Sequence, residues 1–420
     1  MNDPFQTSEE LYNIGIFEAV GIELEYMIAD SGTLDVQPIC DKILFEISGS
    51  YENEVYPDGE SGFSAWSNEL ALHVLEFKSL KPIPDLTGAG KLFQKEVASA
   101  NRILEKYNAG LLPTAMHPWM KPEHEFRIWP HGNREIYNTF DRIFGCRGHG
   151  WSNLQSIHIN LPFRNNDEFI KLHTAIRVLL PVMNALSASS PFIEGGFSGF
   201  HDTRMEVYRT NSSLIPSVTG SIIPEPATGI DNYKETILNR IYSDLESLDP
   251  DKIISHEWVN ARGCIARFER GAIEIRTNDI QECPAADIAC ARLVIEILKK
   301  LVNEELSSFE EQINADTESL YKVLLSVIKN GTSAFIEDAG YLHIFGLKNR
   351  CYAVEFWEKM AELNFSDSGT DSVFLSNIFK HGNLSERILR SAGKTPSKQQ
   401  LFSVYSDLSL CLSEGNQYIP

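Results

Sequence analysis

Three short stretches of the sequence carry charged or amide side chains at alternate positions, with apolar residues between them. These stretches are residues 21–26 (GIELEY), 157–161 (IHINL) and 273–277 (IEIRT). Side chains alternate between the two faces of a β-strand, so each stretch predicts a strand with one apolar and one polar face. Three unrelated strands that face water would show the same alternation. The recurrence of carboxylate, imidazole and guanidinium groups at the same offset instead favours one shared site.

The polar face of such a sheet could bind a hard cation and an anionic ligand. It would carry Glu23, Glu25, His158, Asn160, Glu274 and Arg276. Two carboxylates at close range repel each other, and a divalent cation such as Mg²⁺ or Mn²⁺ removes that cost. An imidazole ligand suits Mn²⁺ as well as Mg²⁺. Arg276 could match phosphate oxygens beside a cation at Glu274, although these two side chains could also form a plain ion pair.

Further elements must position these strands. The pattern predicts strands over residues 14–30, 69–79 and 265–277, helices over 86–107 and 166–189, and a mostly helical chain from 300 to 413; residues 41–48 alternate only weakly. The strand over 69–79 carries Glu76 between apolar neighbours, which makes it a third buried carboxylate, or else a surface residue of an edge strand. Hairpin-like pairs and uneven alternation favour an α+β fold, with a largely antiparallel sheet backed by helices on one face. We expect residues 1–300 to form a catalytic domain and residues 301–420 a helical region packed on it.

Composition narrows the class of protein. The chain has 420 residues and a net charge of −21, which argues against a nucleic-acid partner but allows a locally basic pocket. Seven scattered cysteines without a CxxC motif indicate free thiols in a reducing cytoplasm. The N-terminal residues lack the pattern of a signal peptide, and no stretch approaches the length of a membrane span. We therefore expect a cytoplasmic protein with small-molecule ligands and no membrane association.

The common nucleotide-binding loops are absent from the sequence. Gly393-Lys394-Thr395 imitates the end of a Walker motif, but Ile388 stands where its first glycine belongs. The glycine-rich segment 195–199 follows a predicted helix rather than a strand, which makes it a weak candidate for a phosphate loop. If ATP binds to this chain, we expect metal ions and arginines on a sheet to hold it.

The ordered set of motifs resembles the glutamate–cysteine ligase family, in its bacterial carboxylate–amine ligase branch with a sheet of the glutamine-synthetase type. The matching segments are residues 21–25, Glu69 with 75–77, 114–119, 155–160, 185–192, 202–204 and 272–279. Their order and spacing extend over residues 14–295. Each motif alone has little specificity, and the ordered set has more.

This resemblance implies roles for individual residues. The metal ligands for two or three Mg²⁺ ions, with Mn²⁺ as an alternative, would be Glu23, Glu25, Glu69, Glu76, His158 and Glu274. Arg276 would steady the transferring phosphoryl group of ATP, and Arg204 would contact phosphate or a substrate carboxylate. Asn160 and Gln155 would belong to the amino-acid pocket. The implied reaction is an ATP-dependent ligation, in which an amine attacks an acyl phosphate to form a γ-glutamyl-type amide.

The chain also departs from the family pattern. Lys78 lies on the same face as Glu76, where it could displace a metal ion or reach a phosphate. Glu69 takes the place of an aspartate, and residues 300–420 lack an arginine-rich stretch, so the acceptor amine need not be cysteine. A phosphotransferase of the guanidino-kinase type and a non-catalytic nucleotide-binding protein are the alternatives. The sequence does not indicate the oligomeric state.

Overall fold

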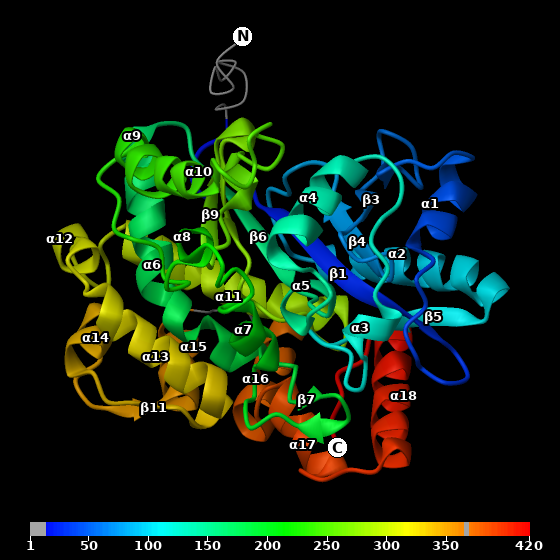
Figure 1. Ribbon diagram of the computed structural model, residues 1–420. Coiled ribbons are helices and arrows are strands. Elements are labelled where there is room, and N and C mark those ends of the chain that lie inside the picture. The colour runs from blue at the N-terminus through cyan, green and yellow to red at the C-terminus, as the bar shows by residue number, and fades with distance from the viewer. Residues whose placement is uncertain (1–13, 365–368) are drawn as a thin grey trace.

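The computed structural model describes residues 14–364 and 369–420 (Figure 1). The centre of this part of the chain is an eight-stranded sheet in the order β2-β3-β4-β1-β6-β10-β9, with β5 also paired to β1. The strands are β1 (Gly21–Asp30), β2 (Glu54–Val55), β3 (Ser64–Asn68), β4 (Val74–Ser79), β5 (Ala109–Leu112), β6 (Ile157–Pro162), β9 (Cys264–Arg267) and β10 (Ala272–Ile275). Each pair of neighbours is antiparallel. Two small hairpins, β7 (Phe192–Ile193) with β8 (Gly196–Phe197) and β11 (Phe335–Ile336) with β12 (Cys351–Tyr352), lie outside this sheet.

Strand β1 lies in the middle of the sheet, and its side chains point alternately to the apolar core and to the polar face. Its apolar residues Ile22, Leu24 and Tyr26 have no exposed surface. They belong to the same core as residues of α2 (Ala89–Leu104) and α11 (Pro284–Val302). The Tyr26 hydroxyl donates a hydrogen bond of 3.5 Å to Asp287 on α11. The alternation of β1 therefore directs Glu23 and Glu25 away from this core.

Most of the remaining chain is helical. The longer helices are α4 (Arg134–Phe144), α6 (Asn166–Ser187), α13 (Thr317–Asn330), α15 (Ala353–Asn364), α16 (Thr370–His381) and α18 (Lys398–Glu414). The shorter ones are α1 (Cys40–Ser48), α3 (Pro122–Glu125), α5 (His149–Ser152), α7 (Thr203–Tyr208), α8 (Pro216–Thr219), α9 (Ile230–Tyr233), α10 (Asn239–Leu245), α12 (Phe309–Ile313), α14 (Ala339–Ile344) and α17 (Leu384–Ala392).

Helix α6 corrects the expectation that no segment is long and apolar enough to span a membrane. It is the one such helix among the described residues, but 89% of its apolar window is buried inside the protein. The side chain of Arg177 in this helix donates hydrogen bonds to the backbone oxygens of Pro224 and Ala315. Length and composition alone therefore do not separate α6 from a membrane helix, but its burial identifies it as a core helix.

The helices of the C-terminal region pack on the sheet. Met27 and Leu112, on β1 and β5, share an apolar cluster with Leu384 of α17 and Tyr405 of α18. Figure 1 shows α18 beside β5. A buried ion pair of 2.5 Å joins Arg387 on α17 to Glu282. The division into a catalytic domain over residues 1–300 and a helical region over residues 301–420 remains a prediction.

Three of the predicted strands differ in the structure. Residues 40–48, whose sequence alternates only weakly, form helix α1, with the buried side chains of Cys40, Ile43 and Leu44 at helical spacing. The predicted strand over 69–79 begins only at Val74, and residues 14–20 precede β1 without joining the sheet as a strand. The predicted strand over 265–277 is a hairpin of β9 and β10. Its turn ends at Gly271, whose φ of 60° favours glycine.

Candidate active site

The register of four neighbouring strands gathers the predicted polar residues. Glu23 on β1 lies opposite His158 on β6, and Glu25 on β1 lies opposite Glu76 on β4. Asn160 on β6 lies opposite both Glu274 on β10 and Gly21 on β1. A Cβ atom at Gly21 would lie 3.0 Å from the Cβ of Asn160, so glycine leaves room for that side chain.

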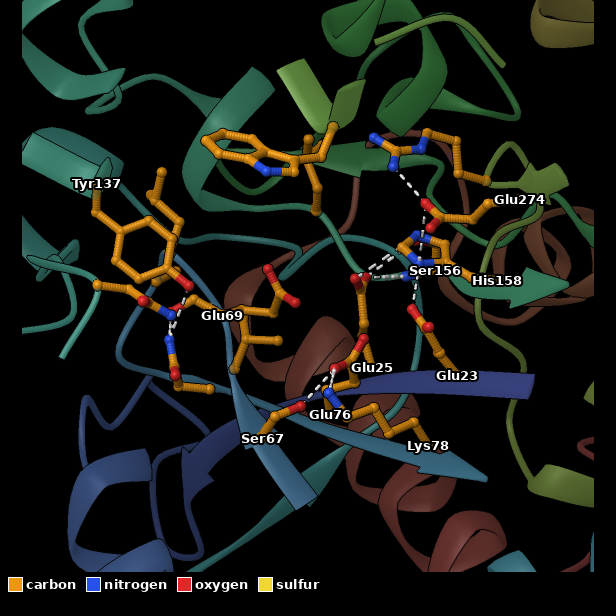
Figure 2. Close-up of a pocket in the computed structure, with 18 of the residues that line it drawn as sticks. Glu23, Glu25, Ser67, Glu69, Glu76, Lys78, Tyr137, Ser156, His158 and Glu274 are labelled. Carbon is orange, nitrogen blue, oxygen red and sulfur yellow. Dashed lines mark hydrogen bonds and ion pairs between the residues drawn. The ribbon is translucent and has the colours of Figure 1, made fainter. Parts of the chain in front are cut away.

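This polar face lines a cavity of about 510 Å³ (Figure 2). Its acidic lining residues are Glu23, Glu25, Glu54, Glu69, Glu76 and Glu274, and its basic ones are Lys78, His158, Arg204, Arg267, Arg270 and Arg276. The predicted metal ligands therefore all reach one cavity. Of the other predicted residues, Arg204 and Arg276 line it as well.

His158 connects three of the glutamates. Its Nδ1 atom lies 3.0 Å from Glu23 Oε2 and 3.9 Å from Glu274 Oε1, and its Nε2 atom lies 3.8 Å from Glu25 Oε1. Burial favours the neutral imidazole, but the hydrogen bond to Glu23 and the three carboxylates outweigh it and raise the pKa of His158 to about 9. A bound metal ion would replace this proton.

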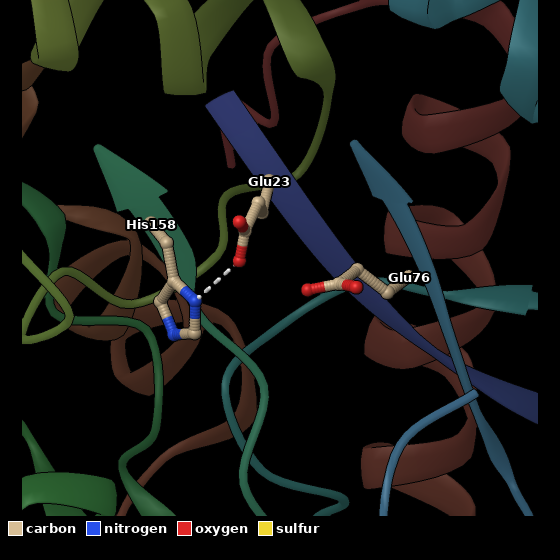
Figure 3. Close-up of side chains that lie close together, drawn as sticks. All are labelled: Glu23, Glu76 and His158. Atoms are coloured by element: carbon tan, nitrogen blue, oxygen red, sulfur yellow. Dashed lines mark hydrogen bonds and ion pairs between the residues drawn. The ribbon is translucent and has the colours of Figure 1, made fainter. Parts of the chain in front are cut away.

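Two overlapping groups of side chains could hold a metal ion. Their ligand atoms lie within 4.8 Å of one another, in Glu23, Glu76 and His158 (Figure 3) and in Glu25, Glu69 and Glu76. Burial, followed by repulsion from Glu23, raises the pKa of Glu76 to about 7. Burial and the charge of Glu76 raise the pKa of Glu69 well above its usual value. These carboxylate oxygens lie close together and repel one another when ionised, so they fit a divalent cation such as Mg²⁺ or Mn²⁺.

Glu69 reaches the cavity from a loop rather than from a strand. It follows β3 directly, and β4 begins only at Val74. Neighbouring Asn68 donates a hydrogen bond of 3.0 Å from Nδ2 to the Tyr137 hydroxyl, which lies on the same side of the cavity as Glu69 (Figure 2). The loop therefore carries one candidate ligand that strand alternation does not predict.

Three arginines form ion pairs with Glu23 and Glu274 on the side of the cavity opposite Glu69 (Figure 2). The Glu274 carboxylate pairs with Arg276, and its Oε2 atom lies 2.7 Å from Arg267 Nη1. The Glu23 Oε1 atom lies 3.1 Å from Arg270 Nη1. Burial opposes ionisation of Glu274, but Arg276 and Arg267 outweigh it and lower its pKa to about 2. The sequence reasoning missed Arg267, the last residue of β9, and Arg270, which lies in the unpredicted turn between β9 and β10.

The remaining predicted residues have different surroundings. Arg204 donates to the backbone oxygens of Thr277 and Arg276 at 2.8 and 2.7 Å, so much of its hydrogen-bonding capacity is already used. Asn160 donates to Glu23 at 3.3 Å and lines a neighbouring cavity of about 280 Å³ rather than the larger one. Gln155 is fully buried and lines neither cavity. The structure therefore does not bring Gln155 to the site, and the adjacent Ser156 lines the cavity instead.

An apolar wall completes the cavity. It is formed by Ile136, Tyr137, Phe140, Trp151, Leu154 and Trp258. The ring of Phe140 lies 5.4 Å from that of Trp151 and 5.8 Å from that of Trp258, measured between centroids. These residues come from three separate segments, and no local pattern in the sequence marks them as one surface.

The sequence model of glutamate–cysteine ligase family 2 (GCS2) matches residues 19–400. The chain belongs to this family. A relative in Archaeoglobus fulgidus, an uncharacterised protein, is 31% identical over 95% of this chain and 100% of its own length. Another in Herpetosiphon aurantiacus, named "Putative glutamate–cysteine ligase 2", is 26% identical over 90% of this chain and 89% of its own.

The family 2 chain also shares its fold with a solved ligase. The glutamate–cysteine ligase of Francisella tularensis, crystallised with AMP, superposes with a TM-score of 0.60 at 11% identity, over 94% of this chain and 88% of that one. The predicted family and the α+β fold with an antiparallel sheet are both confirmed. Membership of family 2 supports a carboxylate–amine ligase as the class of activity.

Proposed function

We propose that this protein joins a carboxylate, most simply the γ-carboxylate of glutamate, to an amine at the expense of ATP. The γ-phosphoryl group of ATP passes to a carboxylate oxygen and ADP leaves. The amine nitrogen then forms a bond to the carbonyl carbon, and the bond from that carbon to the phosphate oxygen breaks. Counted from the ammonium form of the amine, the nitrogen gives up two protons, one to solvent before the attack and one to the departing phosphate. The products are an amide, ADP and phosphate.

This proposal rests on one observation: candidate metal ligands and candidate phosphate-binding side chains line the same cavity. Five glutamates and His158 offer oxygen and nitrogen donors for two or three Mg²⁺ ions. Arginines and Lys78 line the same cavity and could bind phosphate oxygens. When bound, the metal ions would neutralise charge between ATP and the second anionic substrate.

In this proposal, the side chains of the protein bind and orient the metal ions, ATP and the carboxylate substrate. Glu23, Glu25, Glu69, Glu76, His158 and Glu274 hold the metal ions. Arg276, fixed by Glu274, steadies the transferring phosphoryl group, and Arg204 holds a phosphate or the carboxylate substrate. Asn160 orients Glu23 from the side of the smaller cavity. No protein nucleophile is needed, because the carboxylate substrate attacks the phosphoryl group itself.

The direct test measures ADP and phosphate release with ATP and Mg²⁺, with L-glutamate fixed and the amine varied. We expect equal release of both products that depends on both substrates. Glu25→Gln should abolish it, whereas Glu337→Gln, an exposed control, should not. Release of ADP without phosphate would favour the phosphotransferase. Binding of Mg·ATP with no turnover for any pair would favour the non-catalytic protein.

A further inference from the structure

The two ends of the large cavity differ in charge. Its arginines and Lys78 are held by carboxylates or backbone oxygens beside Glu23, Glu76 and Glu274. The apolar wall, which includes Phe140, Trp151 and Trp258, forms another part of the lining. Figure 2 shows Tyr137 and Glu69 on one side and Glu274, Glu23 and His158 on the other. Among the residues that the structure describes, no Lys or Arg side chain forms an ion pair with Glu69 or a cation–π contact with the wall.

The aromatic rings of the wall are held in place but keep part of their surface free. Trp151 donates a hydrogen bond of 3.0 Å from Nε1 to the backbone oxygen of Asn211, and Trp258 stacks on His256 with a centroid separation of 5.4 Å. Both tryptophans are only half-buried, although they line a cavity. Half-buried aromatic rings in a concave site are the usual contact surface for an apolar ligand group.

We infer that the acceptor amine is a primary amine with an aromatic or branched apolar tail and without a carboxylate group. This inference rests on the proposed function and names the class of its second substrate. The tail packs on Phe140, Trp151 and Trp258, and the amino group faces Glu69. A thiol-sized side chain such as that of cysteine would leave most of this wall in contact with water.

The absence of a carboxylate follows from where the cations lie. ATP phosphates and the first substrate's carboxylate would already engage the arginines and Lys78 beside Glu23 and Glu274. A carboxylate on the amine would instead lie near Glu25 and Glu69, with no lysine or arginine of the described chain paired to either. In the proposed complex the charge of the metal ions at Glu25 and Glu69 is already balanced by these glutamates and by the ATP phosphates, so a further carboxylate without a lysine or arginine partner is unfavourable there.

The experiment separates the two features of the amine. With ATP, Mg²⁺ and L-glutamate fixed, product release is measured for phenethylamine, phenylalanine, ethylamine and alanine. We expect kcat/KM for phenethylamine to exceed that for ethylamine by about tenfold or more, because the tail buries apolar surface. Phenethylamine should also exceed phenylalanine. Cysteine and cysteamine form a second pair that varies the carboxylate alone.

Variants connect the preference to the wall. Trp151→Ala should lower kcat/KM for phenethylamine by about tenfold, and Trp151→Phe should restore much of it. Phe335→Ala removes an exposed ring on β11, outside the cavity, and should change nothing. Thermal unfolding of each variant identifies a loss of activity that comes from misfolding. Equal effects of Trp151→Ala on phenethylamine and ethylamine would overturn the assignment of the wall.

The outcomes distinguish this inference from the proposed function. Turnover with cysteine or alanine that exceeds turnover with phenethylamine would preserve the ligase and overturn the inference. If no amine supports turnover, calorimetric titration of the Mg·ATP-bound protein with phenethylamine and ethylamine still tests the wall. Tighter binding of phenethylamine that is lost in Trp151→Ala would support it, and equal or undetectable binding of the two amines would overturn it.

Discussion

Lys78 and Glu76 point to the same face of β4, and the Lys78 ammonium lies 3.8 Å from Glu76 Oε2 and 2.5 Å from Glu54 Oε2. Glu76 is also the member shared by both candidate metal-binding groups. A fixed positive charge therefore stands beside the carboxylate that both groups need. Its position predicts competition between Lys78 and a divalent cation for Glu76.

Removal of this charge should strengthen metal binding. In Lys78→Met, we expect the affinity for Mn²⁺ without nucleotide to rise by about tenfold, because a competing charge near Glu76 is lost. Electron paramagnetic resonance of free Mn²⁺ measures this affinity. Lys322→Met, which removes an exposed lysine paired with Glu318, is the control and should have no effect. Weaker Mn²⁺ binding in Lys78→Met would show that Lys78 supports the metal site instead.

Neutralising Glu69 should have opposite effects with and without metal ions. In EDTA at pH 8, Glu69→Gln should stabilise the fold by about 1 kcal/mol, because it removes the cost of desolvating the Glu69 carboxylate and its repulsion by Glu76 and Glu25. The increase in melting temperature caused by Mg²⁺ should become smaller in this variant. Calorimetric melting with EDTA and with Mg²⁺ provides both values. A variant that melts lower in EDTA, with an unchanged Mg²⁺ effect, would exclude Glu69 as a ligand.

Acid should destabilise the protein partly through His173 on α6. This side chain is buried with no hydrogen-bond partner among the described residues, and burial lowers its pKa from 6.5 to about 3. The unfolded chain therefore binds the extra proton, and stability is lost as the pH falls below 6.5. His173→Phe should retain the aromatic contacts with Phe169 and Tyr233. Between pH 7 and pH 5, the free energy of unfolding should fall by about 2 kcal/mol less in the variant than in the wild type, as measured by urea unfolding. An equal loss would contradict the burial of a neutral imidazole.

The C-terminal region should depend on the buried ion pair of Arg387 and Glu282. Arg387 also donates a hydrogen bond of 2.6 Å to the backbone oxygen of Tyr418, which ties the end of the chain to α17. Arg387→Met should destabilise the protein by about 3 to 5 kcal/mol, because it leaves Glu282 charged, buried and without its cation. The double variant with Glu282→Gln should recover part of this loss. Urea unfolding measures both, and additive losses would contradict the coupling.

The strand pattern alone predicted the glutamates and His158 that alternate on β1 and β6, because period-two alternation is a local property of the sequence. The same alternation explains why Gln155 does not reach the site. Ser156 and His158 line the cavity, so Gln155, at an odd-numbered position, is directed to the buried side. Glu69 depended on the resemblance to a family, since it lies in a loop without periodicity.

Other parts of the site required the three-dimensional structure. Arg270 lies in a turn where the sequence predicted an uninterrupted strand, so its approach to Glu23 had no local signal. Phe140, Trp151 and Trp258 meet only after the chain folds, since they belong to three separate segments. Long-range contacts of this kind do not follow from periodicity or from short motifs.

The most direct test of the account follows an oxygen atom. The enzyme is incubated with ATP, Mg²⁺, an accepted amine and L-glutamate labelled with ¹⁸O in its γ-carboxylate, and the released phosphate is analysed by mass spectrometry. The account predicts one ¹⁸O atom in each phosphate, because the carboxylate oxygen leaves with the phosphoryl group. Amide formation with unlabelled phosphate would contradict activation of the carboxylate by ATP.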